Sequence, residues 1–293
     1  MLLSIDHNTT YSYGKKVVLA PHTVRLRPRD GGGQMTHMFS LKTDPPEAGR
    51  SVNSDLDGNT TVTLWFTGEF DSLAIDTRCV VETLRENPFD FIVSDVSFLD
   101  LPMRYPPEQK AALGPYLAVS RKSALAVSEL CETILSATRG KTTDFILSLC
   151  QHIHDNFPHV AREHGVPWSA ERTLREKRGS CRDIVELFAS VCRSAGLACR
   201  HVSGYALSKR RKKGDELHAW AEVYIPGGGW RGYDPSSGLA VSDRHVAVAS
   251  GATNGLIAPV SGSFYGDGAE AQLRFRVRVR ETSIRERKAL GFL

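Results

Sequence analysis

Long apolar stretches are missing from this chain of 293 residues. A membrane-spanning helix needs at least about 18 consecutive apolar residues, and no segment provides them, so the sequence predicts no membrane span. The start, Met1 to His7, also lacks the basic region and the apolar run of a secretory signal peptide. We therefore expect a cytoplasmic protein without a membrane partner, in which a free thiol stays reduced.

Regular cysteine spacing is missing as well. The chain has six cysteines but no Cys-x-x-Cys pair. In a chain of this length, that spacing predicts neither a disulfide framework nor a zinc site. Cys192, Cys199 and His201 come nearest to a ligand set, but one helical and two strand-like positions suit a tetrahedral metal poorly. We expect no metal and no cofactor.

A strong charge of either sign is also absent, since the net charge is +4. Basic residues gather in Lys209 to Lys213, just before His218, and they alternate with Phe275, Val277 and Val279 near the C-terminus. Neither stretch alternates basic residues with a row of stacking aromatics, so we expect no nucleic-acid partner. The run 209–213 is either a solvated loop or a loop that draws acidic peptide or cell-wall substrates toward a nearby site.

The first part of the chain has the pattern of short β-strands. Alternating apolar residues, up to about residue 95, are separated by turn-rich segments such as Asp30–Gly33, Asp44–Pro46 and Asp57–Asn59. This pattern favours a β-sandwich over residues 1–100, with no catalytic constellation of its own. The prolines of residues 101–120 exclude a long helix and predict a linker.

Residues 121–293 have a mixed pattern and predict a second domain. We expect helices over 123–137, 142–156, 170–178 and from Cys181 to about 195. We expect strands over 199–207, in a hairpin around 226, and over 273–279. Helices packed on an antiparallel sheet make an α+β domain, so the predicted fold class is α+β with an N-terminal β-sandwich.

The most informative residue is Cys181, which precedes an apolar repeat. Ile184, Leu187, Phe188 and Val191 follow at offsets of three and four, which is typical of one buried helical face. The cysteine therefore lies in the first helical turn. There the helix dipole and the unpaired backbone N–H groups favour a thiolate, the nucleophilic form of cysteine.

His218 and Asp234 flank a predicted hairpin. Alternating residues lead into the turn Pro226–Gly229, and the midpoint between His218 and Asp234 is position 226. A hairpin centred there would set the two side chains roughly opposite each other, about 5 Å apart between Cβ atoms. The imidazole could then take the thiol proton of Cys181 while the carboxylate fixes its tautomer.

Each of these residues also has a structural interpretation. A lone cysteine is often a small buried residue, a histidine at a strand start is usually structural, and Asp before Pro is a common turn element. The order of the three residues, with a helix start and a hairpin, favours the catalytic interpretation. A non-catalytic scaffold with the same fold remains the alternative.

Several motifs resemble bacterial transglutaminase-like proteins, which belong to the papain-like cysteine enzymes. In the second domain they are Gly179-Ser-Cys181-Arg-Asp183, Val202-Ser-Gly-Tyr205, His218-Ala-Trp220-Ala-Glu222-Val and Gly232-Tyr-Asp234-Pro235. In the first domain they are His7-Asn-Thr-Thr-Tyr-Ser-Tyr13, Pro21 to Pro28 and Asp57-Gly-Asn59. The segment from His159 to Trp168 departs from the family pattern. The resemblance covers nearly the whole chain.

The resemblance implies a transglutaminase-like catalytic core with Cys181 as nucleophile, His218 as general base and acid, and Asp234 as orienting group. We expect a thioester intermediate on peptide or isopeptide amide bonds, with hydrolysis favoured over transfer to an amine. The Cys181 N–H is a natural oxyanion donor, and the Trp168 indole is a candidate for the second. Trp220 either lines the substrate cleft or belongs to the core. The expected partner is a peptide or protein substrate, with acidic peptides among the candidates.

Overall fold

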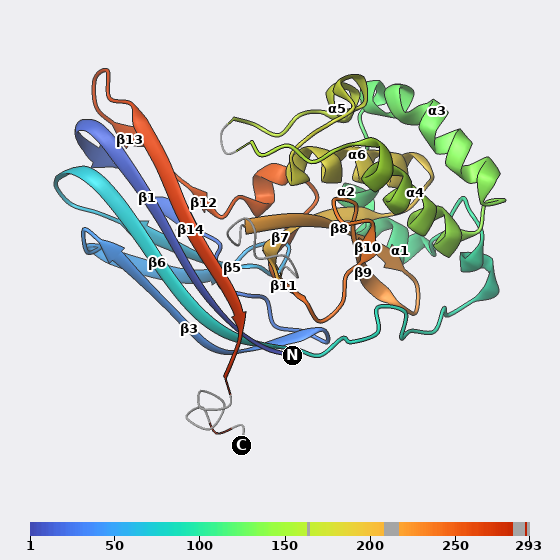
Figure 1. Ribbon diagram of the computed structural model, residues 1–293, viewed down its shortest axis with the longest axis horizontal. Coiled ribbons are helices and arrows are strands. Elements are labelled where there is room, and N and C mark those ends of the chain that lie inside the picture. The colour runs from blue at the N-terminus through green and yellow to red at the C-terminus, as the bar shows by residue number, and fades with distance from the viewer. Residues whose placement is uncertain (163–164, 208–216, 284–290, 292–293) are drawn as a thin grey trace.

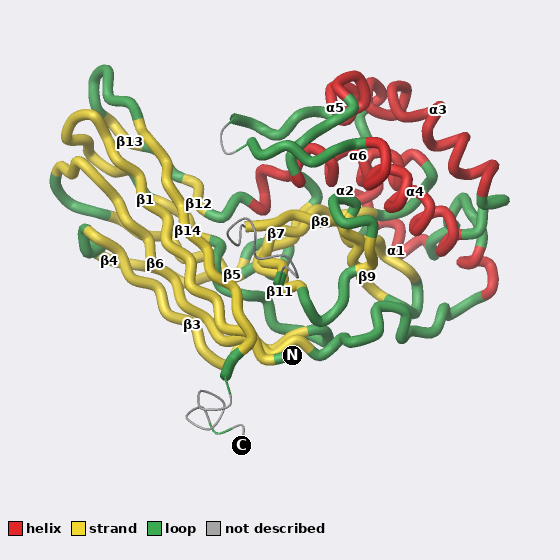
Figure 2. The backbone as a smooth tube through the Cα atoms, in the orientation of Figure 1, coloured by secondary structure: helices red, strands yellow, loops and turns green. Residues whose placement is uncertain are grey.

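The structure is a computed structural model that describes residues 1–162, 165–207, 217–283 and 291. A strand-rich part lies beside a part in which helices cover a separate sheet (Figure 1, Figure 2). The basic run 209–213 lies outside the described residues. The predicted α+β class is confirmed, because a strand-rich N-terminal region accompanies mixed helices and antiparallel sheet.

Two antiparallel sheets make up the strand-rich part. The larger has the order β13-β1-β6-β3, with β14 also paired to β1, and the smaller has the order β12-β2-β5-β4. The strands of the larger sheet are β1 (Leu2–Leu19), β3 (Gln34–Asp44), β6 (Glu69–Thr83), β13 (Phe264–Tyr265) and β14 (Ala271–Glu281). Those of the smaller sheet are β2 (His22–Val24), β4 (Gly49–Ser54), β5 (Thr60–Trp65) and β12 (Val260–Ser261).

Apolar side chains from both sheets form a common core. Leu26, Leu64, Leu73 and Ile75 are almost completely buried in it. Burial of such side chains contributes about 1.5–3 kcal/mol each. The two sheets therefore form the β-sandwich that the alternating, turn-rich pattern predicted.

The strand predicted over residues 273–279 forms as part of β14, but in the other sheet. It pairs antiparallel with β1, with Thr9 opposite Phe275 and Tyr11 opposite Leu273. The prediction that this strand joins the sheet of the second domain is therefore wrong. Period-two alternation identifies a strand and its buried face, whereas the choice of neighbour depends on packing far away in the sequence.

The second part is an antiparallel sheet covered by helices (Figure 1). Its strand order is β10-β9-β8-β7-β11, and helix α6 packs on β7 and β8. The strands are β7 (Cys199–Ala206), β8 (Leu217–Ile225), β9 (Gly229–Asp234), β10 (Leu239–Ala240) and β11 (His245–Gly251). The helices are α3 (Arg121–Ala137), α4 (Thr142–Asn156), α5 (Ala170–Glu176) and α6 (Cys181–Ser194). None of the described helices is long and apolar enough to cross a membrane.

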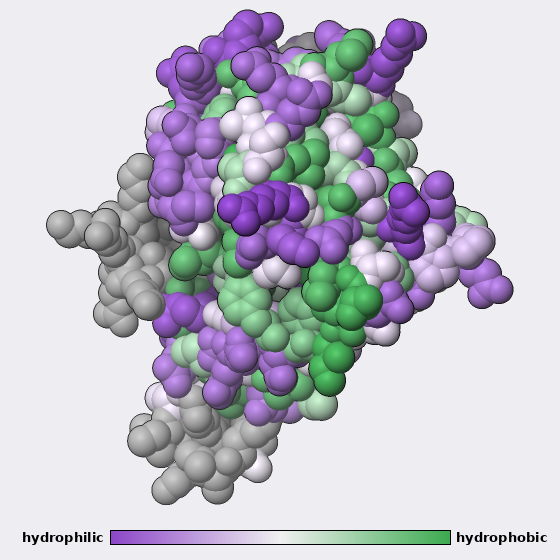
Figure 3. Space-filling view, turned by 90° about the vertical axis from the view of Figure 1, so that its right-hand side faces the viewer, coloured by the Kyte–Doolittle hydropathy of each residue, from purple (hydrophilic) through white to green (hydrophobic). Residues whose placement is uncertain are grey.

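The segment between the two parts holds only short helices. They are η1 (Val96–Leu99), α1 (Pro107–Ala112) and α2 (Gly114–Leu117), while η2 (Asn254–Ile257) follows β11. Met103, Tyr105 and Leu113 are buried in the core of the second part, so this segment packs as well as connects. The helix-bearing side of the molecule shows hydrophilic and hydrophobic residues side by side at its surface (Figure 3).

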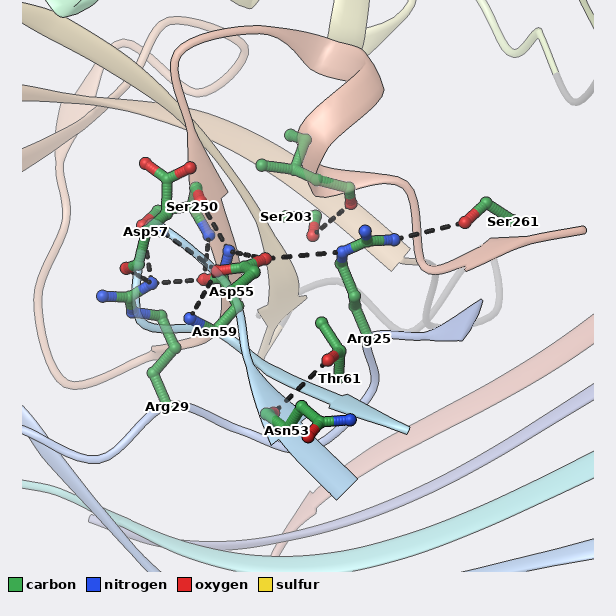
Figure 4. A network of polar contacts seen from close by, with 11 residues as sticks. Arg25, Arg29, Asn53, Asp55, Asp57, Asn59, Thr61, Ser203, Ser250 and Ser261 are labelled. Atoms are coloured by element: carbon green, nitrogen blue, oxygen red, sulfur yellow. Dashed lines mark hydrogen bonds and ion pairs between the residues drawn. The ribbon is translucent and has the colours of Figure 1, made fainter. Parts of the chain in front are cut away.

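Two kinds of contact hold the described residues of the parts together. The first is a shared apolar cluster, in which Ile5 and Val279 of the larger sheet pack with Tyr205 and Val246 of the second part. The second is polar and connects the loop between β4 and β5 to β11 (Figure 4). Asn59 donates from Nδ2 to the Ser250 carbonyl at 2.8 Å and accepts the Ser250 N–H at 2.8 Å.

Candidate active site

Cys181 is the first residue of α6, as the apolar spacing predicted. Ser180 precedes it, and its N–H and hydroxyl both donate to Asp183 Oδ2 at 2.8 Å. The fully buried Asp183 also accepts from the Trp168 N–H at 2.7 Å and from Arg162 Nη1 at 2.9 Å. Asp183 thus fixes the loop before the helix and with it the position of the thiol.

His218 and Asp234 come together from neighbouring strands. His218 Nε2 lies 2.9 Å from Asp234 Oδ2, which leaves Nδ1 for the thiol. Asp234 is further held by the Ser236 N–H at 3.0 Å and by the Ser237 hydroxyl at 2.9 Å. The carboxylate is therefore fixed at both oxygens, and the imidazole takes its orientation from it.

The centre of the hairpin turn differs by one residue from the prediction, which shifts the strand pairing by two residues. Ile225 pairs with Gly229, so the turn is centred on Gly227 instead of on position 226. His218 and Asp234 are consequently diagonal neighbours, not direct cross-strand partners, and long side chains still meet across such a diagonal. Gly227 has a φ of +87°, which favours glycine. Three successive glycines gave no local basis for choosing the turn centre.

The charges of Cys181, His218 and Asp234 stabilise one another. Burial raises the pKa of the Cys181 thiol, but hydrogen bonds to His159 and His218 and their positive charges outweigh it and lower the pKa to about 6. Burial lowers the pKa of His218, but the Asp234 carboxylate and the Cys181 thiolate raise it well above its usual value. The arrangement therefore favours a thiolate beside an imidazolium at neutral pH.

A second imidazole at the thiol, His159, was missed from the sequence. A parallel bridge joins His159 to Gly179, and the Val160 N–H donates to the Gly179 carbonyl at 2.9 Å. This pairing brings the His159 side chain to the thiol of Cys181, where it contributes to the low pKa. No helix or strand period marks His159. Its one signal was that the segment from His159 to Trp168 departs from the family pattern.

Trp168 and Trp220, the two tryptophans considered from the sequence, do not line the cleft described below. The Trp168 indole lies between the guanidinium groups of Arg162 and Arg172, each 4.3 Å from its ring centre. That position favours a packing role over the role of second oxyanion donor, for which the sequence made Trp168 a candidate. Trp220 is buried beneath His218, with ring centres 6.4 Å apart. It belongs to the core, which was one of the two interpretations of the sequence.

Because Gly204 has no side chain, it leaves space for the Trp220 ring. A Cβ atom at this position would lie 2.1 Å from the Val246 carbonyl oxygen and 2.5 Å from the Trp220 ring. Only glycine fits so close to both groups. Gly204 lies opposite His218 in the β7–β8 pairing, so it makes room for the Trp220 ring two residues along the strand from the histidine.

One group of side chains has the composition of a metal site. His218, Asp234 and His245 each offer a ligand atom within 4.8 Å of the others. His245 Nε2 is 3.5 Å from the same Asp234 oxygen that holds His218. A cation there would compete with His218 for Asp234, so the group fits the orientation of a histidine better than it fits a resident metal.

A cleft of about 470 Å³ opens over the thiol, between the two parts of the molecule. Its floor includes Cys181, His218 and His159. Strands β1 and β14 of the sandwich contribute the opposite wall. The nucleophile is therefore accessible to a substrate that lies between the domains.

Comparisons with known proteins agree with this architecture. Residues 129–235 match the transglutaminase-like superfamily, and residues 3–82 match the bacterial transglutaminase-like N-terminal region. The uncharacterized protein ML0607 of Mycobacterium leprae is 26% identical over 292 residues, which cover 91% of this chain and 94% of that protein. The uncharacterized protein YebA of Bacillus subtilis is 30% identical over 74 residues, covering 22% of this chain and 10% of YebA.

A crystal structure shares the fold over almost the whole chain. It is a protein from Cytophaga hutchinsonii, assigned provisionally as a cysteine protease, with a TM-score of 0.71 and 21% identity. The match covers 97% of this chain and 92% of that one. The chain therefore carries a transglutaminase-like core and a bacterial transglutaminase-like N-terminal region.

Proposed function

We propose that this protein is a cysteine-dependent acyl-transfer enzyme that hydrolyses peptide or isopeptide amide bonds. The observation that carries the proposal is the chain of contacts from the Cys181 thiol to His218 and from His218 Nε2 to Asp234 at 2.9 Å. A nucleophile, a base within hydrogen-bond reach and an orienting carboxylate are the parts that nucleophilic amide cleavage requires.

The reaction would proceed in two steps. The Cys181 thiolate attacks the amide carbonyl carbon, and the Cys181 N–H at the start of α6 stabilises the oxyanion. The C–N bond breaks as the imidazolium of His218 gives its proton to the leaving amine, which leaves a thioester. Water then attacks the thioester while His218 takes its proton. The C–S bond breaks, the acid is released, and the thiolate is restored.

The lining of the cleft supports water as the acceptor. No aspartate or glutamate is among the described residues that line it. A lysine-type amine would therefore find no carboxylate partner among these described lining residues as it approached the thioester. Transfer to an amine, as in a transglutaminase, is the alternative that the test below separates.

The six cysteines are all free thiols, which suits a reducing compartment. We propose the cytoplasm as the site of action. Fractionation of cells that produce the tagged protein tests this, and recovery from the periplasm or the medium would contradict it.

The test of activity is intact-mass analysis of a mixed peptide pool incubated with wild type or with Cys181→Ala, with and without a primary amine. Cleaved or deamidated peptides with wild type alone would support a hydrolase. Glutamine peptides that carry the amine would instead identify a transglutaminase. An unchanged pool, together with iodoacetamide labelling of Cys181 no faster than that of an ordinary thiol, would overturn the proposal in favour of a non-catalytic scaffold.

A further inference from the structure

The wall opposite the nucleophile is one face of a single β-sheet. Residues of β1 and β14 alternate between the two faces, and Thr9 pairs with Phe275 while Tyr11 pairs with Leu273. These four side chains therefore share one face, and all four line the cleft that holds Cys181.

The same sheet face has three different surroundings along its length. At one end, Ile5 and Val279 pack against the second part of the molecule. At the other end, Tyr13 packs inside the sandwich. Between these ends, Leu273 and Phe275 of β14 open to the cleft, and beside them on β1 Tyr11 lines the cleft while it also packs against the sandwich core. Phe275 is 37% exposed there, whereas Val277 and Val279 on the same face are each 6% exposed.

The surface around this stretch is mostly apolar. Besides the sheet residues, the cleft is lined by Val166 and Pro167 on one side and by Ile257, Ala258 and Val260 on another. An exposed phenyl ring within such a surface loses contact with water when an apolar group covers it, which favours binding.

Two of the described polar side chains in the cleft, His7 and Arg162, already have protein partners. His7 contacts the Tyr205 hydroxyl at 2.8 Å and Thr9 Oγ1 at 3.0 Å, so both of its ring nitrogens are occupied. Burial lowers the pKa of His7 to about 4, and the ring is neutral at pH 7. Arg162 is paired with the buried Asp183 at 2.9 Å. Arg182 donates to the Arg162 carbonyl at 3.2 Å and is the other described arginine of the lining.

We propose that the N-terminal domain supplies a specificity wall, on which Phe275, Leu273 and Tyr11 hold an apolar side chain on the acyl side of the amide bond. The substrate class is thus a peptide with an aliphatic or aromatic residue at that position. This differs from the acidic peptides considered from the sequence. It deepens the proposed function and rests on Cys181 being the nucleophile.

Peptidyl electrophiles that alkylate Cys181 test the wall without requiring turnover. A matched series would carry Leu, Phe, Asp or Lys as the residue next to the reactive carbon, and the rate of Cys181 modification would be followed by intact mass. Wild type should react with the Leu or Phe probe at least about tenfold faster than with the Asp or Lys probe. Equal rates, or faster reaction with the Asp or Lys probe, would overturn the proposal.

Variants identify the wall itself. Phe275→Ser should reduce the preference for the apolar probes about tenfold or more while iodoacetamide, which has no such side chain, labels Cys181 as fast as before. Arg276→Ser is the matched control, since Arg276 is exposed on the other face of β14, and it should retain the full preference. Tyr11→Ser gives a second reading if Phe275→Ser folds poorly. An unchanged preference in the folded wall variants would contradict the assignment.

The outcomes also separate this inference from the proposed function. If iodoacetamide labels Cys181 no faster than an ordinary thiol, the nucleophile assignment fails, and the wall is then tested by calorimetric binding of the matching unreactive peptides to Cys181→Ala. Tighter binding of the Leu than of the Asp peptide would support the wall. Equal or reversed affinities would overturn it.

Discussion

The carboxylate of Asp234 holds His218 across a diagonal of the β8–β9 hairpin, with 2.9 Å between Oδ2 and Nε2. Asp234 is the last residue of β9, and its second oxygen accepts the Ser236 N–H of the following turn. The strand end and the turn therefore fix the carboxylate together. Because the carboxylate orients the imidazole of His218, the other ring nitrogen points toward the Cys181 thiol at the start of α6.

Replacement of Asp234 by asparagine tests this relationship. Asp234→Asn keeps the shape of the side chain but removes the charge that stabilises the imidazolium and selects its tautomer. We expect kcat to fall by about 10³–10⁴ on any substrate found in the peptide pool. Asp71→Asn, an exposed aspartate in the sandwich, is the control and should retain activity. Wild-type kcat in Asp234→Asn would show that the carboxylate does not orient the base.

The pH dependence of Cys181 alkylation tests the ion pair. Because the pKa of the thiol is lowered to about 6, the thiolate is lost only as the pH falls through that value. The rate of iodoacetamide labelling should therefore rise with a midpoint near pH 6, well below the usual thiol value of about 8.5. His218→Ala should move the midpoint upward, since it removes a donor and a positive charge. A wild-type midpoint above pH 8 would contradict the ion pair.

His159 offers a way to separate activation of the thiol from proton transfer. His159→Ala removes one of the two imidazoles at the thiol, so the labelling midpoint should move up in pH. The base His218 stays in place, and we expect kcat/KM at pH 7 to fall by about tenfold, with turnover retained. Labelling profiles of wild type and of a His152→Ala control, a half-buried histidine on α4, provide the comparison. An unchanged midpoint in His159→Ala would exclude a role at the thiol.

Much of the site follows from local sequence patterns. The offsets of Ile184, Leu187 and Phe188 predicted the helix and its buried face, and all three side chains are completely buried. The alternation after His218 and the turn at Pro226 predicted the hairpin. These features depend on neighbours in the chain, which periodicity and turn propensity describe well.

The remainder depends on contacts that no local pattern encodes. The strand pattern around Phe275 and Val277 identified β14 but not its neighbour β1, because either sheet offers an apolar face to it. His159 reaches the thiol through a single parallel bridge to Gly179. For the same reason, no local pattern identified which residues of the N-terminal domain line the cleft.

The stability of the site should depend on Asp183. Its carboxylate is completely buried and accepts from the Ser180 N–H, the Ser180 hydroxyl, the Trp168 N–H and Arg162. Asp183→Ala would leave these donors without an acceptor and the Arg162 charge without its partner. Removal of one member of a buried ion pair costs about 3–5 kcal/mol, so we expect a loss of that size in the free energy of unfolding.

Urea denaturation measures the effect, with Asp144→Ala as the control, because Asp144 is an exposed first-turn aspartate on α4. The control should lose no more than about 1 kcal/mol. Arg162→Ala combined with Asp183→Ala should cost less than the sum of the two single changes, since the charge left unpaired by either is then absent. Equal losses for Asp183→Ala and Asp144→Ala would show that the loop before Cys181 is held in place by other contacts.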